Sequence, residues 1–219
     1  EQSNNVEDRR GSGGLGGGLI GGGGIGIGTL LIAVIAAMIF GVNPLQLIGA
    51  MNGMGSSTAV QQQQTSGTQQ AQANDRDLQF TRTILRDTEV VWEKLFNEAG
   101  GTYVQPKLVL FSGATPTACG TGQAAMGAFY CPLDQTVYLD TNFFKTLRMQ
   151  LGGGGDFAEA YVIAHEIGHH VQKQTGILDK VNAMRGRLSE AQYNAMQVRI
   201  ELQADCLAGV WTSHADARR

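Results

Sequence analysis

The sequence predicts an α+β protein that has one N-terminal transmembrane helix and a mainly helical domain with a small β-sheet. Three observations support this fold class. Residues 25–42 contain no charged side chain and are almost wholly apolar. Apolar residues recur at helical spacing in three later segments, a pattern typical of amphipathic helices. Two short runs, 106–111 and 136–139, have the β-branched and aromatic composition of strands.

The composition excludes several classes of protein. The 219 residues carry a net charge of −3 and include only 16% charged side chains, so we expect no nucleic-acid partner, which would require a basic surface. The 31 glycines occur with only 4 prolines and without a triplet period, which excludes a collagen-like chain. The 3 cysteines are too few for a disulfide scaffold but sufficient for one bridge.

The N-terminal third divides into three predicted segments. Residues 1–24 form a Gly-rich segment that we expect in the cytoplasm, because Arg9 and Arg10 precede the apolar run and positive charge favours that side. Residues 25–42 would measure about 27 Å as a helix, close to the thickness of a bilayer core. Residues 43–74 are rich in Gln, Ser and Gly without hydrophobic periodicity, which indicates a flexible linker.

This arrangement predicts a single-pass protein of the cell membrane whose main domain is extracytoplasmic, in the periplasm or outside the cell. Two other interpretations of residues 25–42 stay open, a buried core helix and a cleavable signal peptide. Small residues in the span would also allow close helix contacts, so a homo-oligomer formed through it is a further hypothesis.

The predicted domain, residues 75–219, begins with a helix that ends at Gly100 and Gly101. Between its two predicted strands lie Cys119 and Cys131. In an oxidising compartment we expect these cysteines to form a disulfide that closes a loop of about a dozen residues. A pair of metal ligands is the alternative. Cys206 lies among apolar residues of a later helical segment and is expected to be buried.

A second helix carries the residues of chemical interest. It begins at Asp156, which has the spacing of a capping box with Glu159. His165 and His169 lie four residues apart, on one side of this helix, and Glu166 follows the first. Two imidazoles one turn apart can bind one zinc ion, and the glutamate can then reach a water on that zinc. A pair of exposed histidines on a solvated helix face is the alternative.

The helix pattern also predicts the surroundings of two residues next to these histidines, Gly168 and His170. Gly168 costs roughly 1 kcal/mol inside a helix relative to Ala, so we expect a close neighbour there, such as a second helix or a substrate strand. His170 is rotated about 100° from His169 around the helix. We therefore expect His170 to point away from the metal and to be hydrogen-bonded elsewhere.

A catalytic zinc site has three protein ligands, so a third must come from another segment. The downstream candidates are Asp179, Glu190, Glu201, Asp205 and His214. Residues 189–214 have the pattern of a long helix, in which Glu201 and Asp205 flank an apolar stripe one turn apart. Because buried acids require partners, we predict that Glu201 binds the metal and that Asp205 accepts the free N–H of His165. The alternative is an acid pair on a solvated face.

These motifs resemble those of known zinc peptidases. Ala164-His-Glu-Ile-Gly-His-His-Val171 followed by Glu201-Leu-Gln-Ala-Asp205 is similar to the HExxH and ExxAD pair of the gluzincins. A more specific resemblance, to the bacterial putative neutral zinc metallopeptidase family, covers nearly the whole chain. It is carried by Cys119-Gly-Thr-Gly122, Phe129-Tyr-Cys-Pro132, Val137-Tyr-Leu-Asp140 and the segment from Glu201 to Trp211, behind a glycine-rich anchor.

The resemblance implies a zincin-like domain with one Zn²⁺ per chain. It implies His165, His169 and Glu201 as ligands and Glu166 as the catalytic acid. Members of the family usually continue beyond the position of Trp211, so we expect the domain to be truncated at its C-terminus.

The expected activity is that of a zinc metalloendopeptidase acting on a peptide or protein substrate, with a zinc-activated water and Glu166 as general base. Tyr138, Tyr193 and His214 are open candidates for the oxyanion donor. An extended peptide is expected to pair along residues 137–140. The alternative function is a catalytically inactive or latent membrane-tethered zinc-fold binding protein, against which the intact Glu166 argues.

Overall fold

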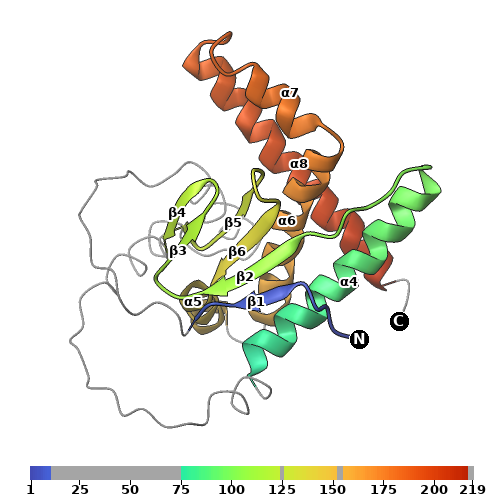
Figure 1. The fold of residues 1–219 in the computed structure, drawn as a ribbon, viewed down its shortest axis with the longest axis vertical. Helices are drawn as coiled ribbons and strands as arrows, with labels where there is room; N and C mark the ends of the chain where they lie inside the picture. Colours follow the sequence, from blue (N-terminus) through green and yellow to red (C-terminus); the bar gives the residue numbers. More distant parts are fainter. Residues whose placement is uncertain (11–74, 124–125, 152–154, 217–219) are drawn as a thin grey trace.

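A small mixed sheet lies along one side of the molecule and long helices lie along the other (Figure 1). The computed structural model describes residues 1–10, 75–123, 126–151 and 155–216. In chain order the elements are β1 (Val6–Asp8), α4 (Arg76–Glu98), β2 (Lys107–Phe111), β3 (Ala114–Thr117), β4 (Gly120–Gln123), β5 (Ala128–Cys131), β6 (Thr136–Asp140), α5 (Thr141–Leu151), α6 (Gly155–Gln174), α7 (Ile177–Ala183) and α8 (Glu190–Asp216).

The main sheet has the strand order β1-β2-β6-β5. β1 and β6 both run parallel to β2, whereas β5 runs antiparallel to β6. The predicted strands at 106–111 and 136–139 therefore agree with β2 and β6 to within one residue. β6 lies inside the sheet, so β5 forms the edge on that side. β3 and β4 make a separate antiparallel hairpin.

The predicted disulfide is confirmed, because Cys119 and Cys131 are bonded. It joins the turn between β3 and β4 to the last residue of β5. Cys206, expected to be buried, is instead a free and exposed thiol. The buried positions on this part of α8 are Ala204 and Ala208, so Cys206 lies on a different side of the helix from the packed residues.

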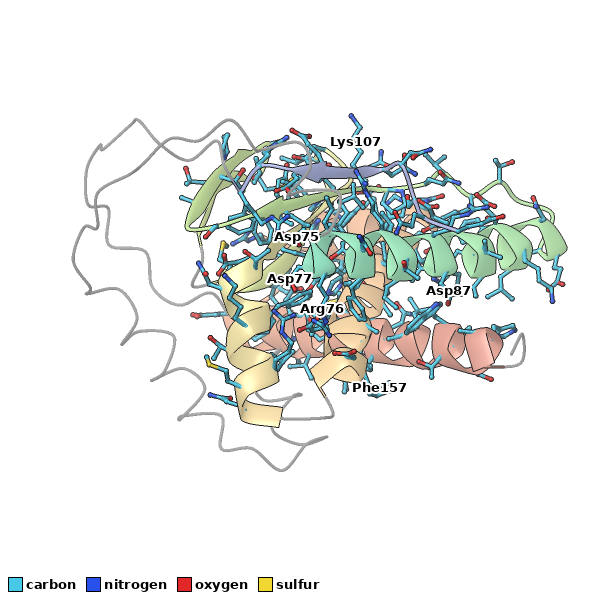
Figure 2. The ribbon with its side chains drawn as sticks, turned by 90° about the horizontal axis from the view of Figure 1, so that it is seen from below. Asp75, Arg76, Asp77, Asp87, Lys107 and Phe157 are labelled. Carbon is cyan, nitrogen blue, oxygen red and sulfur yellow. A yellow bond between two sulfur atoms is a disulfide. The ribbon has the colours of Figure 1, made fainter. Side chains whose placement is uncertain are left out.

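The core lies between the sheet and the helices α4 and α6. Leu108, Leu110 and Leu139 from the sheet are each 0% exposed, as are Leu85 of α4 and Ile163 of α6. Figure 2 shows α4 between the sheet and α8. There Asp87 of α4 points toward α8 and accepts a hydrogen bond from Trp211 Nε1 at 2.9 Å. This packing fixes the two helices that carry the predicted ligands.

The predicted close neighbour of Gly168 is the helix α8. A Cβ atom at Gly168 would lie 2.9 Å from the carbonyl oxygen and 3.1 Å from the Cα of Ala204. Only glycine therefore lets α6 and α8 approach so closely at this point. The predicted capping position differs from the structure, because α6 already begins at Gly155 and Asp156 lies inside its first turn. Glu159 forms an ion pair with Arg148 at 2.5 Å, and Asp156 pairs with Arg76.

The predicted membrane topology is wrong. The expected span at 25–42 and linker at 43–74 lie outside the described residues, and no helix among the described residues is long and apolar enough to cross a membrane. Residues 1–10, expected in the cytoplasm, lie on the domain, because β1 pairs with β2. A single span between them would place β1 and β2 on opposite sides of a membrane.

The fold class and localisation are corrected accordingly. The described residues form a mixed α+β domain that includes residues 1–10, and the single-pass arrangement with its cytoplasmic N-terminus and extracytoplasmic domain is not retained. The predicted boundary at residue 75 coincides with the start of α4, where Asp75 caps the helix by accepting a hydrogen bond from the N–H of Leu78 at 3.0 Å. The hypothetical oligomer contact falls on residues outside the described ones.

Candidate metal centre

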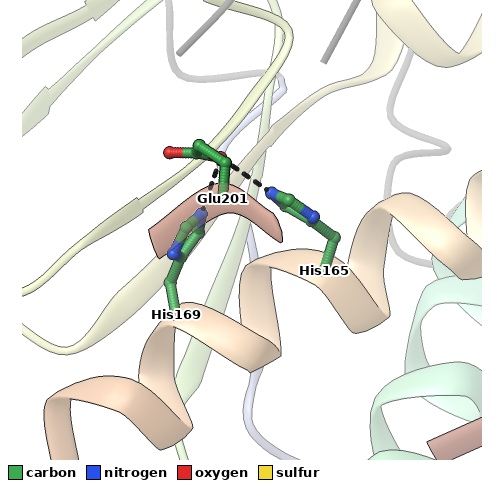
Figure 3. Close-up of side chains that lie close together, drawn as sticks. All are labelled: His165, His169 and Glu201. Carbon is green, nitrogen blue, oxygen red and sulfur yellow. Dashed lines mark hydrogen bonds and ion pairs between the residues drawn. The ribbon is translucent and has the colours of Figure 1, made fainter. Parts of the chain in front are cut away.

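Two helices bring the candidate ligands together. His165 and His169 project from one side of α6, and Glu201 projects toward them from α8 (Figure 3). One ligand atom from each residue lies within 4.8 Å of the other two. Glu201 Oε2 is 3.2 Å from His165 Nε2 and 3.3 Å from His169 Nε2. The three residues predicted as ligands therefore face one common point.

The ring orientations leave the facing nitrogens available. Nδ1 of His165 lies 2.8 Å from Oδ1 of Asp205, and Nδ1 of His169 lies 2.9 Å from Oε1 of Gln172. Both partners are oxygen acceptors, so each Nδ1 carries a proton, and in the neutral ring each Nε2 is left with a lone pair. Both Nε2 atoms face Glu201, and imidazole in this form is a metal ligand.

The donor set fits a zinc ion. Two imidazole nitrogens and one carboxylate oxygen are typical ligands of catalytic zinc. In a tetrahedral site with bonds of about 2.0–2.1 Å, two ligand atoms are about 3.3 Å apart. The separations of 3.2 and 3.3 Å between Glu201 and the two histidines match this value.

The ligands form an ion pair when they meet without a metal. Burial raises the pKa of Glu201, but hydrogen bonds from His165 and His169 outweigh it and lower this pKa to about 2. Burial lowers the pKa of His165, whereas hydrogen bonds to Asp205 and Glu201 raise it to about 10. Since a protonated imidazole cannot bind a metal, metal binding here must release a proton.

Glu166 lies beside the ligands as a buried carboxyl group. It is 2% exposed, and burial raises its pKa. The charges of His169 and His165 act in the opposite direction, as does a hydrogen bond from the backbone N–H of Tyr130. A buried carboxyl group with a raised pKa next to a candidate metal site is suited to proton transfer.

Asp205 has a second donor that the sequence analysis missed. The hydroxyl of Tyr161 donates to Oδ1 of Asp205 at 2.6 Å, so this oxygen is held by both Tyr161 and His165. Burial and this hydrogen bond raise the pKa of Tyr161. Tyr161 precedes His165 by one helical turn, a spacing that could have identified it.

The three candidate oxyanion donors have other partners. Tyr138 donates to Asp134 at 2.8 Å and packs with Phe129 and Phe111, on the side of the sheet opposite to the core leucine of β6, Leu139. Tyr193 donates to Asn182 of α7 at 3.4 Å, and His214 donates to Val210 O at 2.9 Å in the last part of α8. No contact within the described ranges joins these three side chains to the ligand cluster.

His170 points away from the cluster, as expected. Its Nε2 donates to the carbonyl oxygen of Val104 at 2.7 Å, so its Nδ1 accepts the hydroxyl of Tyr130 at 2.9 Å. Burial lowers the pKa of His170, which favours this neutral form. The ring therefore fixes β5 and the segment before β2 against α6.

Comparisons with known proteins agree with this donor set. A family model described as "Putative neutral zinc metallopeptidase" matches residues 1–219. The uncharacterized protein YpfJ of Escherichia coli (strain K12) is 47% identical over 214 residues, which are 96% of this chain and 72% of that protein. Uncharacterized proteins of Mycobacterium bovis and Mycobacterium tuberculosis (strain H37Rv) are each 47% identical over 128 residues, 58% of this chain and 41% of theirs. No solved structure matches the chain.

Proposed function

The chain belongs to the putative neutral zinc metallopeptidase family, and we propose that it is a zinc-dependent endopeptidase that hydrolyses peptide bonds in proteins. One observation carries the proposal. One oxygen of Glu201 lies at zinc-ligand spacing from the Nε2 atoms of both His165 and His169, and the buried carboxyl group of Glu166 belongs to the same helix turn as these histidines.

In the proposed mechanism, three residues bind the metal and a fourth transfers the proton. His165, His169 and Glu201 would hold one zinc ion, which supplies a Lewis acid that polarises a water and the scissile carbonyl group. Glu166 takes a proton from the water as the water oxygen bonds to the carbonyl carbon. The C–N bond then breaks, and Glu166 delivers the proton to the leaving nitrogen.

The local environment of Glu166 supports this role. Burial favours its protonated form, which is the form that donates to the leaving nitrogen, while the nearby imidazoles and the Tyr130 N–H favour the carboxylate that accepts the first proton. The proposed role requires both forms in turn, because Glu166 serves first as base and then as acid.

The substrate is proposed to pair with β5. The strand expected for this role, residues 137–140, belongs to β6, whose two sides are occupied by β2 and β5. β5 pairs on one side with β6, and on its other side the N–H of Tyr130 is directed at Glu166. An extended peptide added along this edge would pass beside Glu166 through main-chain hydrogen bonds.

The proposal is tested by zinc content and hydrolysis of an unfolded protein by the full chain, beside Glu166→Gln. We expect one zinc per chain in both proteins and a loss of cleavage of at least about a hundredfold in the variant. Glu98→Gln is the matched control, since Glu98 is an exposed acid that pairs only loosely, at 3.8 Å, with Lys94. It should cleave like the wild type.

Each other outcome has a definite meaning. If both proteins bind zinc and neither cleaves the substrate, the peptidase proposal is wrong, and the chain is a catalytically inactive zinc-fold binding protein. Absence of zinc from the wild-type chain would overturn the assignment of His165, His169 and Glu201.

A further inference from the structure

We propose that Gln172 is a positioning residue of the zinc site, which holds His169 in the form that binds metal and ties it to α8 beside Glu201. The inference rests on the proposed function, because it assigns a role within the same zinc site. Gln172 belongs to neither predicted motif. It lies on α6 three residues after His169 and is 0% exposed.

The carbonyl oxygen of Gln172 determines which nitrogen of His169 carries the proton. Oε1 lies 2.9 Å from His169 Nδ1, and an amide oxygen can only accept. His169 therefore donates from Nδ1, which leaves Nε2, 3.3 Å from Glu201, as the nitrogen whose lone pair is available to a metal in the neutral ring. Without this acceptor, the neutral ring could place its proton on Nε2, where it would block the metal.

The amide nitrogen of Gln172 connects the same side chain to α8. Nε2 donates to the carbonyl oxygen of Ile200 at 2.8 Å and to Oε1 of Gln203 at 3.0 Å. Ile200 immediately precedes Glu201. One side chain thus holds both the ring of His169 and the backbone next to the third ligand.

These contacts require an amide at position 172. Reversing the amide would place its NH₂ group against the N–H of His169 and its oxygen against the oxygen of Ile200, two repulsive contacts in a buried place. A carboxylate could accept from His169 but could not donate to Ile200. The other histidine ligand, His165, has the carboxylate of Asp205 as its acceptor, so the two imidazoles are held by groups of different charge.

The experiment measures the zinc dissociation constant of the full chain, with zinc alone as the probe in competition with a chelator. Gln172→Met, which removes all three contacts, should weaken zinc binding by about 10- to 100-fold, the usual effect of losing an outer hydrogen-bond partner of a ligand. Gln172→Glu keeps an acceptor for His169 but cannot donate to Ile200, so it should recover only part of this loss. Gln174→Met is the matched control, because Gln174 lies on the same helix but donates to Val104 O, and its zinc affinity should not change.

Two results would overturn the assignment. One is wild-type affinity in Gln172→Met, and the other is an equal loss in Gln172→Met and Gln172→Glu, which is expected if residue 172 serves only to pack α6 against α8. If Gln172→Met does not fold, ¹⁵N NMR of the zinc-loaded wild type decides. We expect the proton of His169 on Nδ1 and the metal on Nε2, and the reverse arrangement contradicts the proposal.

The same measurements separate this inference from the proposed function. A wild-type chain that binds zinc without cleaving peptides would overturn the proposed peptidase activity. The comparison of zinc affinities would still decide the role of Gln172. A wild-type chain that binds no zinc would overturn both. If the chain cleaves, saturating zinc should restore most of the activity of Gln172→Met, because Glu166 is intact.

Discussion

Three glutamates of this protein are buried, but each has different hydrogen-bond and charge partners. Glu89 accepts hydrogen bonds from Ser3 and Asn5 at 2.7 Å each, which satisfies one of its oxygens within the fold. Glu159 pairs with an arginine but leaves one oxygen, Oε2, without a hydrogen-bond partner in the described part of the chain. Glu166 is next to His165 in the chain, and the charges of the two imidazoles of the candidate metal centre lower its pKa against the effect of burial. Burial alone thus does not single out a candidate catalytic carboxyl group, and it is the position beside the candidate metal ligands that distinguishes Glu166.

Glu159 should make the stability of the fold depend on pH. Burial raises its pKa from 4.5 to about 7, although the charges of Arg148 and Arg76 lower it. The folded state therefore holds the proton more tightly than the unfolded state. This contribution to the free energy of unfolding is fully present below pH 4.5 and is lost as the pH rises through 7.

In Glu159→Gln this dependence should disappear. Urea unfolding of the wild type at about pH 5 and pH 8 should reveal a decrease on the order of 1–3 kcal/mol that the variant lacks. Asp156→Asn is the control, since Asp156 lies one turn earlier on α6 with a side chain that is 65% exposed. Equal pH dependence in the wild type and Glu159→Gln would contradict the prediction.

At the residue scale, sequence reasoning reached the residues whose arrangement depends on helix geometry alone. The spacing of His165 and His169, and of Glu201 and Asp205, places each pair on one side of its helix, and the structure brings these residues together. Gln172 was missed because its partners depend on which part of α8 packs against α6. No local pattern specifies that register.

At the scale of elements, the crossing of α6 and α8 at Gly168 sets the distance between the ligands. In Gly168→Ala the new methyl group would meet backbone atoms of Ala204 at 2.9 and 3.1 Å, which cannot move without shifting α8. We expect the free energy of unfolding to fall by about 1–3 kcal/mol and zinc affinity to fall by about tenfold, as for other disturbed ligand surroundings.

Gly209→Ala provides the control for this prediction. Gly209 lies on α8, and a Cβ atom there would have no neighbour within 4 Å, so alanine should raise stability by about 0.5–1 kcal/mol through helix propensity. Thermal or urea unfolding and zinc titration of both variants make the comparison. If both substitutions stabilise the protein alike, the close crossing is not a constraint in solution.

Strands were harder to predict than helices. β2 and β6 were found because they are buried runs of β-branched and aromatic residues. β5 has only four residues and ends at a disulfide cysteine, so its sequence resembles a loop. The order of the strands depends on pairing between distant segments. The sequence alone therefore favours residues 137–140 as the edge, whereas in the structure β5 forms it.

At the scale of the whole molecule, the first ten residues belong to the same folded body as the domain after residue 74. The backbone of this segment bonds to β2 through Leu108 N–H to Asn5 O at 2.9 Å and Arg9 N–H to Leu110 O at 2.8 Å. Arg10 also pairs with Asp75 at 3.0 Å, next to the start of α4. A strand of only three residues within a polar segment has no detectable periodicity, so the sequence could not predict this docking.

This docking predicts that residues 75–219 alone are less stable than the full chain. Without residues 1–10, the outer side of β2 loses its partner strand, and the buried Glu89 loses Ser3 and Asn5. The unsatisfied carboxylate alone should lower the free energy of unfolding by about 1–3 kcal/mol. A peptide of residues 1–10 added to the fragment should raise its melting temperature in proportion to the logarithm of peptide concentration, because it binds only the folded state.

A peptide in which Ser3 and Asn5 are both alanine separates strand pairing from recognition of Glu89. It keeps the backbone that pairs with β2 but lacks the two side chains that bond to the buried carboxylate. It should therefore bind the fragment more weakly and raise the melting temperature less than the native peptide at the same concentration. If the fragment is as stable as the full chain and neither peptide changes its melting temperature, β1 does not contribute to the fold in solution.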